Sequence, residues 1–280
     1  MRTAIIPALL VMLSGAALDA AEQFRLLVMQ AQKGDAAKYA PLAEYLADKG
    51  VPATVEGASG YGAAAAKFAK GEAEAMVAGS AVAGILIIKD LAEPVARPES
   101  AAGVSTYKAV ILAKKGAAPY DGKASYFAGK TVTCCALASS GELFLKSALA
   151  GSDVKVEPAV AKSHGAAIEA LARDQAQLAI VKNMVWAKEQ AKQPDLVQVG
   201  EDDGVNPDNT LIVAKQVDAA TKAKVTEALL GLEKDQSPAA MKVKEALGCA
   251  RYIPTTKETF AHNLLMLGKA GISKDFAFQN

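Results

Sequence analysis

Ser139, Ser140 and Gly141 form the turn with the clearest capacity to bind an anion. The turn lies between an expected strand at 130–133 and an expected helix at 141–149. Such a turn leaves backbone N–H groups free at the helix start, where the helix dipole favours negative charge. The two hydroxyls add neutral donors, so the turn suits a phosphoryl group. In the alternative interpretation a serine merely caps the helix, which is the commoner role of serine there.

Ser163 and His164 occupy a second turn of the same kind, between an expected strand and an expected helix. A ring N–H of His164 can donate to an oxyanion. A lone histidine more often has a structural role. Ligands of open α/β sheets gather beyond the carboxyl ends of the strands, and this position favours a binding role for both residues.

Three further residues are candidates for the same site. Tyr61 follows a glycine-rich stretch, and its hydroxyl either reaches a ligand or packs on a helix surface. Lys182 and Asn183 close another expected strand, and either could face a ligand. A lysine at such a position is more often solvated, so Asn183 is the stronger candidate of the two.

No catalytic or cofactor motif accompanies these residues. The sequence contains no GxxxxGK[ST], no GxSxG, no HExxH and no GxGxxG at a first strand. With two histidines and no CxxC pattern, a zinc site has little support, and we expect no cofactor. A hydrolase that uses His164 is the weakest interpretation, because no partnered nucleophile is apparent.

The three cysteines are Cys134, Cys135 and Cys249. Adjacent cysteines rarely pair with each other, because the backbone geometry is poor. A bridge from either of them to Cys249 is possible in an exported protein. The favoured interpretation is that all three are small buried thiols.

Apolar runs and helical patterns alternate along the chain, which predicts an α/β fold with mainly parallel strand pairing. Extended segments are expected at 24–29, 53–55, 74–77, 94–97, 107–113, 130–133, 154–160, 177–181, 196–199 and 211–214. Helices are expected at 36–49, 61–70, 141–149, 164–173, 221–247 and 257–269. After Asn206 the pattern gives one strand and then only helices.

The expected strands fall into two groups, which predicts two lobes. We assign 1–21 to a signal peptide, 22–105 to the first part of lobe 1, 106–206 to lobe 2, and 207–280 to the return into lobe 1 with the C-terminal helices. Met1 and Arg2 begin a positively charged start, an apolar run covers 5–13, and small residues follow. This three-part pattern is typical of a secretory signal peptide and indicates the periplasm. No later stretch is apolar enough for a transmembrane helix.

Composition excludes some classes of partner. Lys and Arg number 31, Asp and Glu number 30, and the net charge is +1. General nucleic-acid binding and attachment to an anionic membrane surface both call for a strong basic excess. We therefore expect no binding to nucleic acid. A buried anion site needs only a few local donors, so the balanced charge is compatible with the small anionic ligand that we expect, and we expect a monomer.

The order of these segments resembles the periplasmic phosphate/phosphite/phosphonate-binding proteins of ABC importers, over roughly 24–255. The landmarks are the helix 39–49 with Gly50-Val51-Pro52, Tyr61 before a helix, 107–113, Ser139-Ser140-Gly141, Ser163-His164, 177–181 and Asn206-Pro207-Asp208. The resemblance implies a two-lobed type II periplasmic binding protein fold, with each lobe a mixed, mostly parallel sheet flanked by helices. It also implies closure over the ligand by hinge motion and delivery to an ABC permease in the membrane.

The resemblance also implies roles for particular residues. Tyr61 matches a tyrosine that bonds the oxyanion, Ser139 and Ser140 match the last two hydroxyls of a Ser-Thr-Ser turn, and His164 matches a histidine. Three departures leave the ligand open. Ala138 replaces the first hydroxyl of the turn, and 78–83 lacks an aromatic residue, so that Ser80 is the substitute donor. Near Asn183 the acidic residue of many relatives is absent.

The sequence therefore favours an exported solute-binding protein that captures phosphate, phosphite or a phosphonate, without enzymatic activity. The alternative is a ligand-binding sensory or accessory partner of a membrane signalling or redox complex. The expected ligand-binding residues are Tyr61, Ser80, Ser139, Ser140, Gly141, Ser163, His164 and Asn183.

Overall fold

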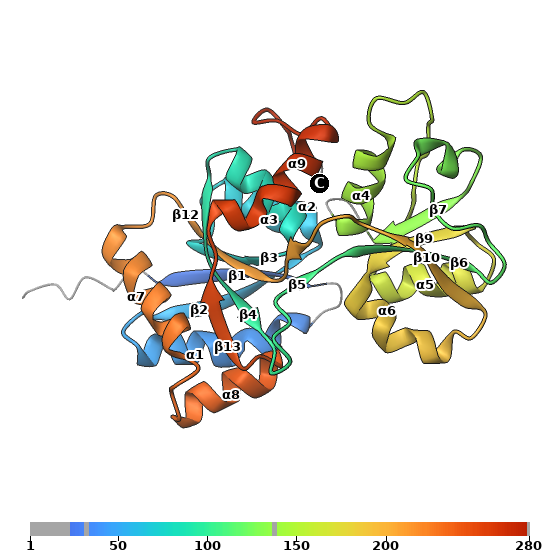
Figure 1. Ribbon diagram of the computed structural model, residues 1–280. Helices are drawn as coiled ribbons and strands as arrows, with labels where there is room; N and C mark the ends of the chain where they lie inside the picture. Colours follow the sequence, from blue (N-terminus) through green and yellow to red (C-terminus); the bar gives the residue numbers. More distant parts are fainter. Residues whose placement is uncertain (1–22, 31–33, 136–138, 279–280) are drawn as a thin grey trace, which may run out of the picture.

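Two β-sheets form the centres of two lobes, which lie side by side in the computed structural model (Figure 1). The structure describes residues 23–30, 34–135 and 139–278. The expected signal peptide at 1–21 and the departure at Ala138 lie outside the described residues. We call the lobe with the six-stranded sheet lobe 1 and the lobe with the five-stranded sheet lobe 2.

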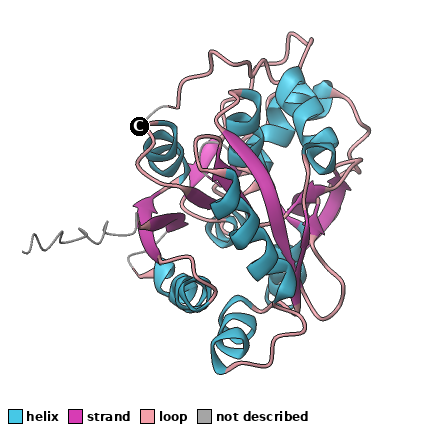
Figure 2. Cartoon of the chain, turned by 90° about the vertical axis from the view of Figure 1, so that its left-hand side faces the viewer, coloured by secondary structure: helices cyan, strands magenta, loops and turns pink. Residues whose placement is uncertain are grey.

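Lobe 1 has the strand order β13-β4-β12-β3-β1-β2. Its strands are β1 (Phe24–Gln30), β2 (Ala53–Ser59), β3 (Ala75–Ala78), β4 (Ala92–Glu99), β12 (Thr210–Ala214) and β13 (Arg251–Pro254). One face is covered by α1 (Ala40–Asp48), α7 (Ala219–Gly231) and α8 (Pro238–Leu247). The other face is covered by α2 (Tyr61–Ala69), α3 (Ser80–Ile88) and the 3₁₀ turn η4 (Lys257–Phe260), which leads into α9 (Ala261–Lys269). Helices thus lie on both sides of the strands (Figure 2).

Lobe 2 has the strand order β10-β6-β9-β7-β8. Its strands are β6 (Ala109–Lys114), β7 (Val132–Cys135), β8 (Ala159–Ala161), β9 (Leu178–Lys182) and β10 (Leu196–Glu201). Helix α4 (Ser140–Leu149) packs on one face, and α5 (His164–Ala172) and α6 (Asn183–Glu189) pack on the other. Short 3₁₀ turns complete the described elements: η1 (Asp35–Tyr39) in lobe 1, and η2 (Ala124–Phe127) and η3 (Gln190–Lys192) in lobe 2.

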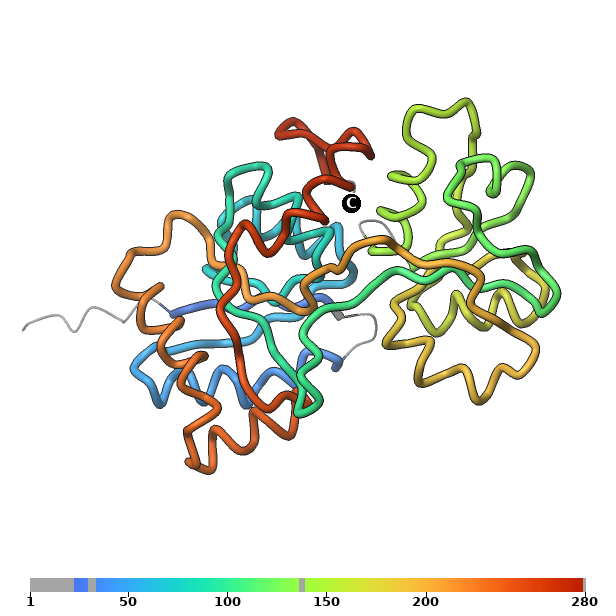
Figure 3. The backbone as a smooth tube through the Cα atoms, in the orientation of Figure 1, coloured from blue at the N-terminus to red at the C-terminus, as the bar shows by residue number. Residues whose placement is uncertain are grey.

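Two chain segments cross between the lobes side by side (Figure 3). They pair as the antiparallel strands β5 (Thr106–Tyr107) and β11 (Asn206–Pro207). A chain of hydrogen-bonded polar side chains, of which Asp202, Asn206 and Asn263 are buried and His262 is partly exposed, fixes this crossing to α9. Asp202 contacts His262 at 2.7 Å and accepts from Asn206 at 3.0 Å, and Asn263 donates to Asn206 at 3.2 Å. Because buried polar groups need partners, this chain of bonds holds the crossing in one geometry.

The two-lobed α/β prediction is confirmed, and both sheets are mixed. Antiparallel pairing is more extensive than expected, because β12 and β13 return against β3 and β4, and β6 runs against β9 and β10. The expectation of a single strand after Asn206 is wrong, since β13 is a second one. Helix α3 was not expected, because its SAVAGILII sequence is apolar all round and buried, and lacks a helical polarity pattern. The expected strand 154–160 is reduced to β8.

Several local findings complete the fold. Cys134, Cys135 and Cys249 are buried, and none of them is in a disulfide, in agreement with the favoured interpretation. Within the described ranges, no helix is long and apolar enough to cross a membrane. In those same ranges, the acidic, histidine and cysteine side chains form no group of three that could hold a metal ion.

Candidate functional site

The carboxyl ends of the parallel strands in the two lobes lead to the same site. In lobe 1, β2 and β3 lead to the starts of α2 and α3, which carry Tyr61 and Ser80. In lobe 2, β7, β8 and β9 are parallel and lead to Ser140, His164 and Lys182. Parallel strands gather such residues at one edge of a sheet, which is where open α/β sheets bind ligands.

The two serines of the turn before α4, Ser139 and Ser140, have different roles. Ser139 caps the helix, since its Oγ accepts from the Glu142 N–H at 3.2 Å and donates to the Cys135 carbonyl at 2.5 Å. Ser140 is also buried, but its hydroxyl has no hydrogen-bond partner among the described residues. Burial raises the pKa of the Tyr107 phenol, and Ser140 is close enough to oppose that rise slightly without a hydrogen bond of good geometry. Ser140 is therefore the serine with donor capacity left over.

Gly141 sets the position of this helix start. A Cβ there would lie 2.3 Å from the Ile180 carbonyl oxygen and 3.1 Å from the Cys134 Cβ. Only glycine lets α4 approach β9 and β7 this closely, so the role that the structure gives Gly141 is packing.

Changing Gly141 to alanine is expected to destabilise the protein by about 1–3 kcal/mol, because the strand backbone that it would strike cannot move aside. Displacement of Ser140 should weaken ligand binding as well. Chemical denaturation and a binding titration would measure the two effects. Gly268→Ala in α9 is the matched control, because a Cβ there meets nothing within 4 Å. Equal stability of the two variants would contradict this account of Gly141.

Ser163 and His164, in the turn before α5, also have different roles. Ser163 caps the helix by accepting from the Ala166 N–H at 3.1 Å. Both ring nitrogens of His164 are buried and lack a hydrogen-bond partner among the described residues. Burial, assisted by the nearby Lys182 ammonium, lowers the pKa of His164 to about 4. The ring is therefore neutral at pH 7, with one donor and one acceptor unused.

On the lobe 1 side, Gly60 turns the chain so that Tyr61 begins α2. The φ of Gly60 is 95°, in a region that favours glycine. Burial is the main cause that raises the pKa of Tyr61 to about 12, so its phenol remains a donor at neutral pH. Ser80 is fully buried and hydrogen-bonds the hydroxyl of Tyr107, which lies on the crossing strand β5. The segment 78–83 contains no aromatic residue. Tyr107 supplies an aromatic hydroxyl beside Ser80 in its place.

Lys182 lies at the centre of the site, and the expectation that it is solvated is wrong. Its side chain is only 16% exposed, and its Nζ is 2.6 Å from Asp208 and 4.1 Å from the centroid of the Tyr107 ring. Burial alone would lower the pKa of Lys182, but the attraction of Asp208 outweighs it and the pKa is raised. Folding brings Asp208, which lies on the crossing segment, to Lys182. A buried ammonium is stable only with such a partner.

Asp208 is held on both carboxylate oxygens. Oδ1 accepts from Lys182, and Oδ2 accepts from the Asn209 side chain at 3.0 Å. Tyr39, on η1, is buried near the same pair. Burial and the Asp208 charge raise the pKa of Tyr39 to about 12. The site therefore contains a nearly neutral ion pair surrounded by phenols and hydroxyls.

Asn183 faces away from this cluster. Its Oδ1 accepts from the Lys108 N–H at 3.1 Å, which ties the start of α6 to the beginning of β6. Of the predicted residues, the structure brings together Tyr61, Ser80, Ser140 and His164, and uses Ser139, Gly141, Ser163 and Asn183 in local structure. A ligand role for the latter four stays a prediction.

We call the gathered set the cradle: Tyr61, Ser80, Tyr107, Ser140, His164, Lys182 and Asp208. Sequence reasoning missed Tyr107 and Asp208 as site residues. The available signal for Lys182 was its place at the end of a strand whose neighbours end at Ser140 and His164. No local signal marks Asp208, because only the chain crossing brings it to Lys182.

Comparison with known proteins decides the family. The family model described as "ABC transporter, phosphonate, periplasmic substrate-binding protein" matches residues 26–260. The chain belongs to this family. The family consists of substrate-binding proteins that act with an ABC permease and work in the periplasm. No curated protein matches the chain at a significant level.

Several solved structures share the fold. A Xanthomonas citri protein has been solved with chloride and separately with ATP, and it has 14% identity to this chain. The chloride-bound structure has a TM-score of 0.73, and the match covers 89% of this chain and 98% of that one. A Prochlorococcus marinus protein in complex with methylphosphonate has 13% identity and a TM-score of 0.70, with the same coverage. A binding protein component of an ABC phosphonate transporter from Pseudomonas aeruginosa has 15% identity and a TM-score of 0.69, covering 88% and 86%. Type II periplasmic binding architecture follows from these likenesses.

Proposed function

We propose that this protein is the solute-binding subunit of an ABC importer and that its cradle holds a small phosphorus oxyanion: phosphate, phosphite or a phosphonate. The observation that carries the proposal is a group of three buried polar atoms that have no hydrogen-bond partner among the described residues: Ser140 Oγ and the two ring nitrogens of His164. The Lys182 ammonium is close enough to His164 to lower the pKa of its ring, after the larger effect of burial. Unpaired buried polar groups cost free energy, so a ligand that satisfies them gains affinity. Membership of a phosphonate-binding family agrees with this chemistry.

Donors from both lobes and from the crossing segments surround the proposed ligand. Lys182 has three N–H donors. One donates to Asp208 and the ammonium also lies over the Tyr107 ring, so no more than two are left for an anion. Tyr61 and Ser80 would bind from lobe 1, and Ser140 and His164 from lobe 2. A ligand that contacts both lobes favours the closed arrangement, which the permease then recognises.

Asp208 gives the site a means of selecting among oxyanions. A carboxylate only accepts hydrogen bonds, so it favours a ligand that still carries a proton on oxygen. Phosphate, phosphite and phosphonates can keep a hydroxyl proton near neutral pH, whereas sulfate has none. We therefore expect discrimination against sulfate.

A sensory role is the second candidate. A histidine kinase sensor domain with similarity to periplasmic binding proteins shares the fold, with 13% identity, a TM-score of 0.54 and coverage of 81% of this chain and 97% of that one. That likeness shows the fold alone. Restored growth on the bound oxyanion, in cells that lack their own binding protein but contain the cognate permease, would support transport over sensing.

Thermal unfolding with a panel of phosphate, phosphite, methylphosphonate, aminoethylphosphonate, sulfate and small carboxylates tests the proposed ligand class. A ligand at about a hundredfold above its dissociation constant adds about 2.7 kcal/mol of stability. We expect such a shift with at least one phosphorus oxyanion and little shift with sulfate. Absence of any shift with the phosphorus compounds would rule out the proposed ligand class.

Two serine variants serve as matched controls in the same experiment. Ser139→Ala removes a helix cap and should cost about 1 kcal/mol of stability. Ser140→Ala removes a hydroxyl that has no partner among the described residues, so it should leave stability nearly unchanged and still reduce the ligand-induced shift. An undiminished ligand-induced shift in thermal unfolding of Ser140→Ala would show that this serine does not bind the ligand.

A further inference from the structure

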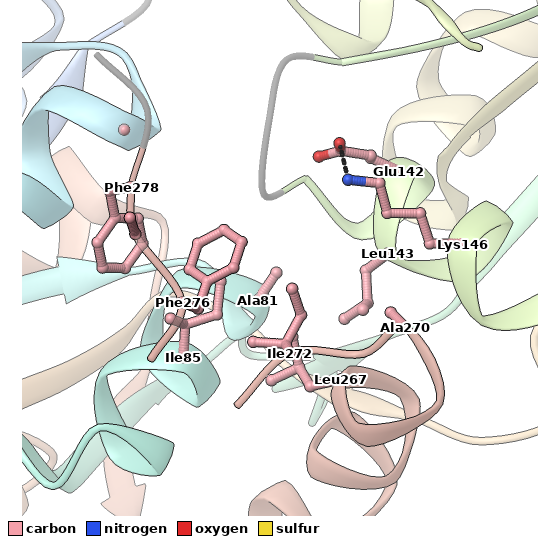
Figure 4. A pocket seen from close by; sticks show the side chains of 12 residues that line it. Ala81, Ile85, Glu142, Leu143, Lys146, Leu267, Ala270, Ile272, Phe276 and Phe278 are labelled. Atoms are coloured by element: carbon pink, nitrogen blue, oxygen red, sulfur yellow. Dashed lines mark ion pairs between the residues drawn. The ribbon is translucent and has the colours of Figure 1, made fainter. Parts of the chain in front are cut away.

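An apolar pocket lies between the lobes (Figure 4). Its walls come from α3 and α4 and from the segment after α9. Ala81, Ile85 and Leu267 stand on the lobe 1 side, and Leu143 projects from α4 on the lobe 2 side. Leu143 is 4% exposed and packs with the lobe 1 residues in one cluster, so the pocket is a junction of both lobes.

The pocket offers little to a charged or polar group. Its polar side chains are Glu142 and Lys146, which are bonded to each other at 2.8 Å. The remaining lining residues are aliphatic, aromatic or glycine. The volume is about 120 Å³. An apolar protein cavity of roughly 150 Å³ accepts benzene, so the pocket suits a group of about that size.

The pocket is next to the cradle along three helices. Gly62 follows Tyr61 at the start of α2, Ala81 follows Ser80 at the start of α3, and Glu142 and Leu143 follow Ser140 in α4. The first residues of these helices face the cradle, and the residues directly after them line the pocket. The cradle and the pocket are therefore adjacent at the starts of α2, α3 and α4.

The outer wall of the pocket is anchored to lobe 1. Phe276 and Phe278 pack edge to face, with centroids 5.5 Å apart. Lys89 holds their segment to α3 by donating to the carbonyls of Lys274 at 2.6 Å and Phe276 at 2.7 Å. This wall belongs to lobe 1, while Leu143 belongs to α4 of lobe 2. A substituent bound between them would add apolar contact to the closed arrangement.

We propose that the natural ligand is an organic oxyanion, a phosphonate or phosphate ester, whose apolar substituent of about phenyl or branched butyl size occupies this pocket. This inference rests on the proposed binding of a phosphorus oxyanion in the cradle. It assigns the pocket as a specificity subsite separate from the residues that hold the charged head.

Isothermal titration of phenylphosphonate, tert-butylphosphonate and methylphosphonate tests the subsite, because the three share one head group. In the unmodified protein the two larger ligands should bind on the order of tenfold more tightly than methylphosphonate, from the additional apolar area that they bury. Ala270→Phe should fill the pocket from its rim, and Phe276→Ala should remove its outer wall. Each variant should reduce the preference to about threefold or less and leave methylphosphonate affinity unchanged.

The matched control is Ala187→Phe, which adds the same ring at an exposed position on α6. It should keep the full preference. Methylphosphonate binding with no preference for the larger ligands would overturn the subsite and leave the proposed function standing. The same holds if the preference survives in both pocket variants. Failure of every phosphonate, with phosphate and phosphite also inactive, would overturn the proposed function and the subsite with it.

Discussion

Replacing Lys182 by methionine is expected to reduce oxyanion affinity at least a hundredfold and to lower stability by about 3–5 kcal/mol. The two effects have separate causes. The variant removes the positive charge nearest to the unpaired donors of the cradle, which should weaken anion binding. It also leaves the Asp208 carboxylate, only 12% exposed, without its cation. Isothermal titration measures the first effect, and chemical denaturation measures the second.

A double variant separates the binding role of Lys182 from its structural role. Lys182→Met combined with Asp208→Asn removes both charges, and replacing a buried ion pair by neutral groups is often neutral or stabilising. The amide introduced by Asp208→Asn would keep an oxygen that can accept from the Asn209 side chain. We expect stability to return to nearly that of the unmodified protein, while oxyanion affinity stays low. Recovery of affinity together with stability would show that Lys182 does not bind the ligand.

Acidification should destabilise the ligand-free protein through His164. The folded-state pKa is about 4, below the ordinary value of 6.5, because burial and Lys182 disfavour the imidazolium. As pH falls below 6.5, the unfolded chain binds a proton that the folded chain refuses until about pH 4. This part of the stability is therefore complete above pH 6.5 and is lost progressively below it. Linkage gives a loss of about 2 kcal/mol at pH 5.

Denaturation of the unmodified protein and of His164→Asn between pH 7.5 and pH 5 isolates this contribution. The difference in unfolding free energy between the two proteins should change by about 2 kcal/mol over that interval. His262→Asn, which removes the other histidine, should retain the contribution from His164. Parallel pH profiles for the unmodified protein and His164→Asn would show that His164 titrates normally in the folded state.

Much of the fold could be predicted because short-range patterns express it. Alternating apolar runs and helical periods locate most elements, including β1, α1, β6 and β9. Helix α3 escaped prediction because both its faces are buried, which leaves no polarity pattern to read. Strand β13 was not predicted, because its RYIP sequence is short and ends in proline. Its pairing with β4 is what makes it a strand.

The candidate site was predicted less completely, and the reason is geometric. Tyr61, Ser140 and His164 follow strand ends, where sequence alone suggests a ligand position. Ser139 and Ser163 stand at the same kind of position, yet their hydroxyls cap helices. Which hydroxyl of a turn bonds the helix backbone and which is left without a partner among the described residues depends on the packing of the helix start, and Gly141 fixes that packing for α4.

The sequence by itself determined the two-lobed α/β class, the likeness to phosphonate-binding proteins and the strand ends where binding residues gather. These features depend on local periodicity and on the order of short motifs. The tertiary structure alone decided that Lys182 is buried, since its partner Asp208 is 26 residues away and arrives on the second crossing segment. It also decided that an apolar pocket adjoins the cradle. Buried charge and interlobe cavities depend on contacts between distant segments, which no local pattern of residue types records.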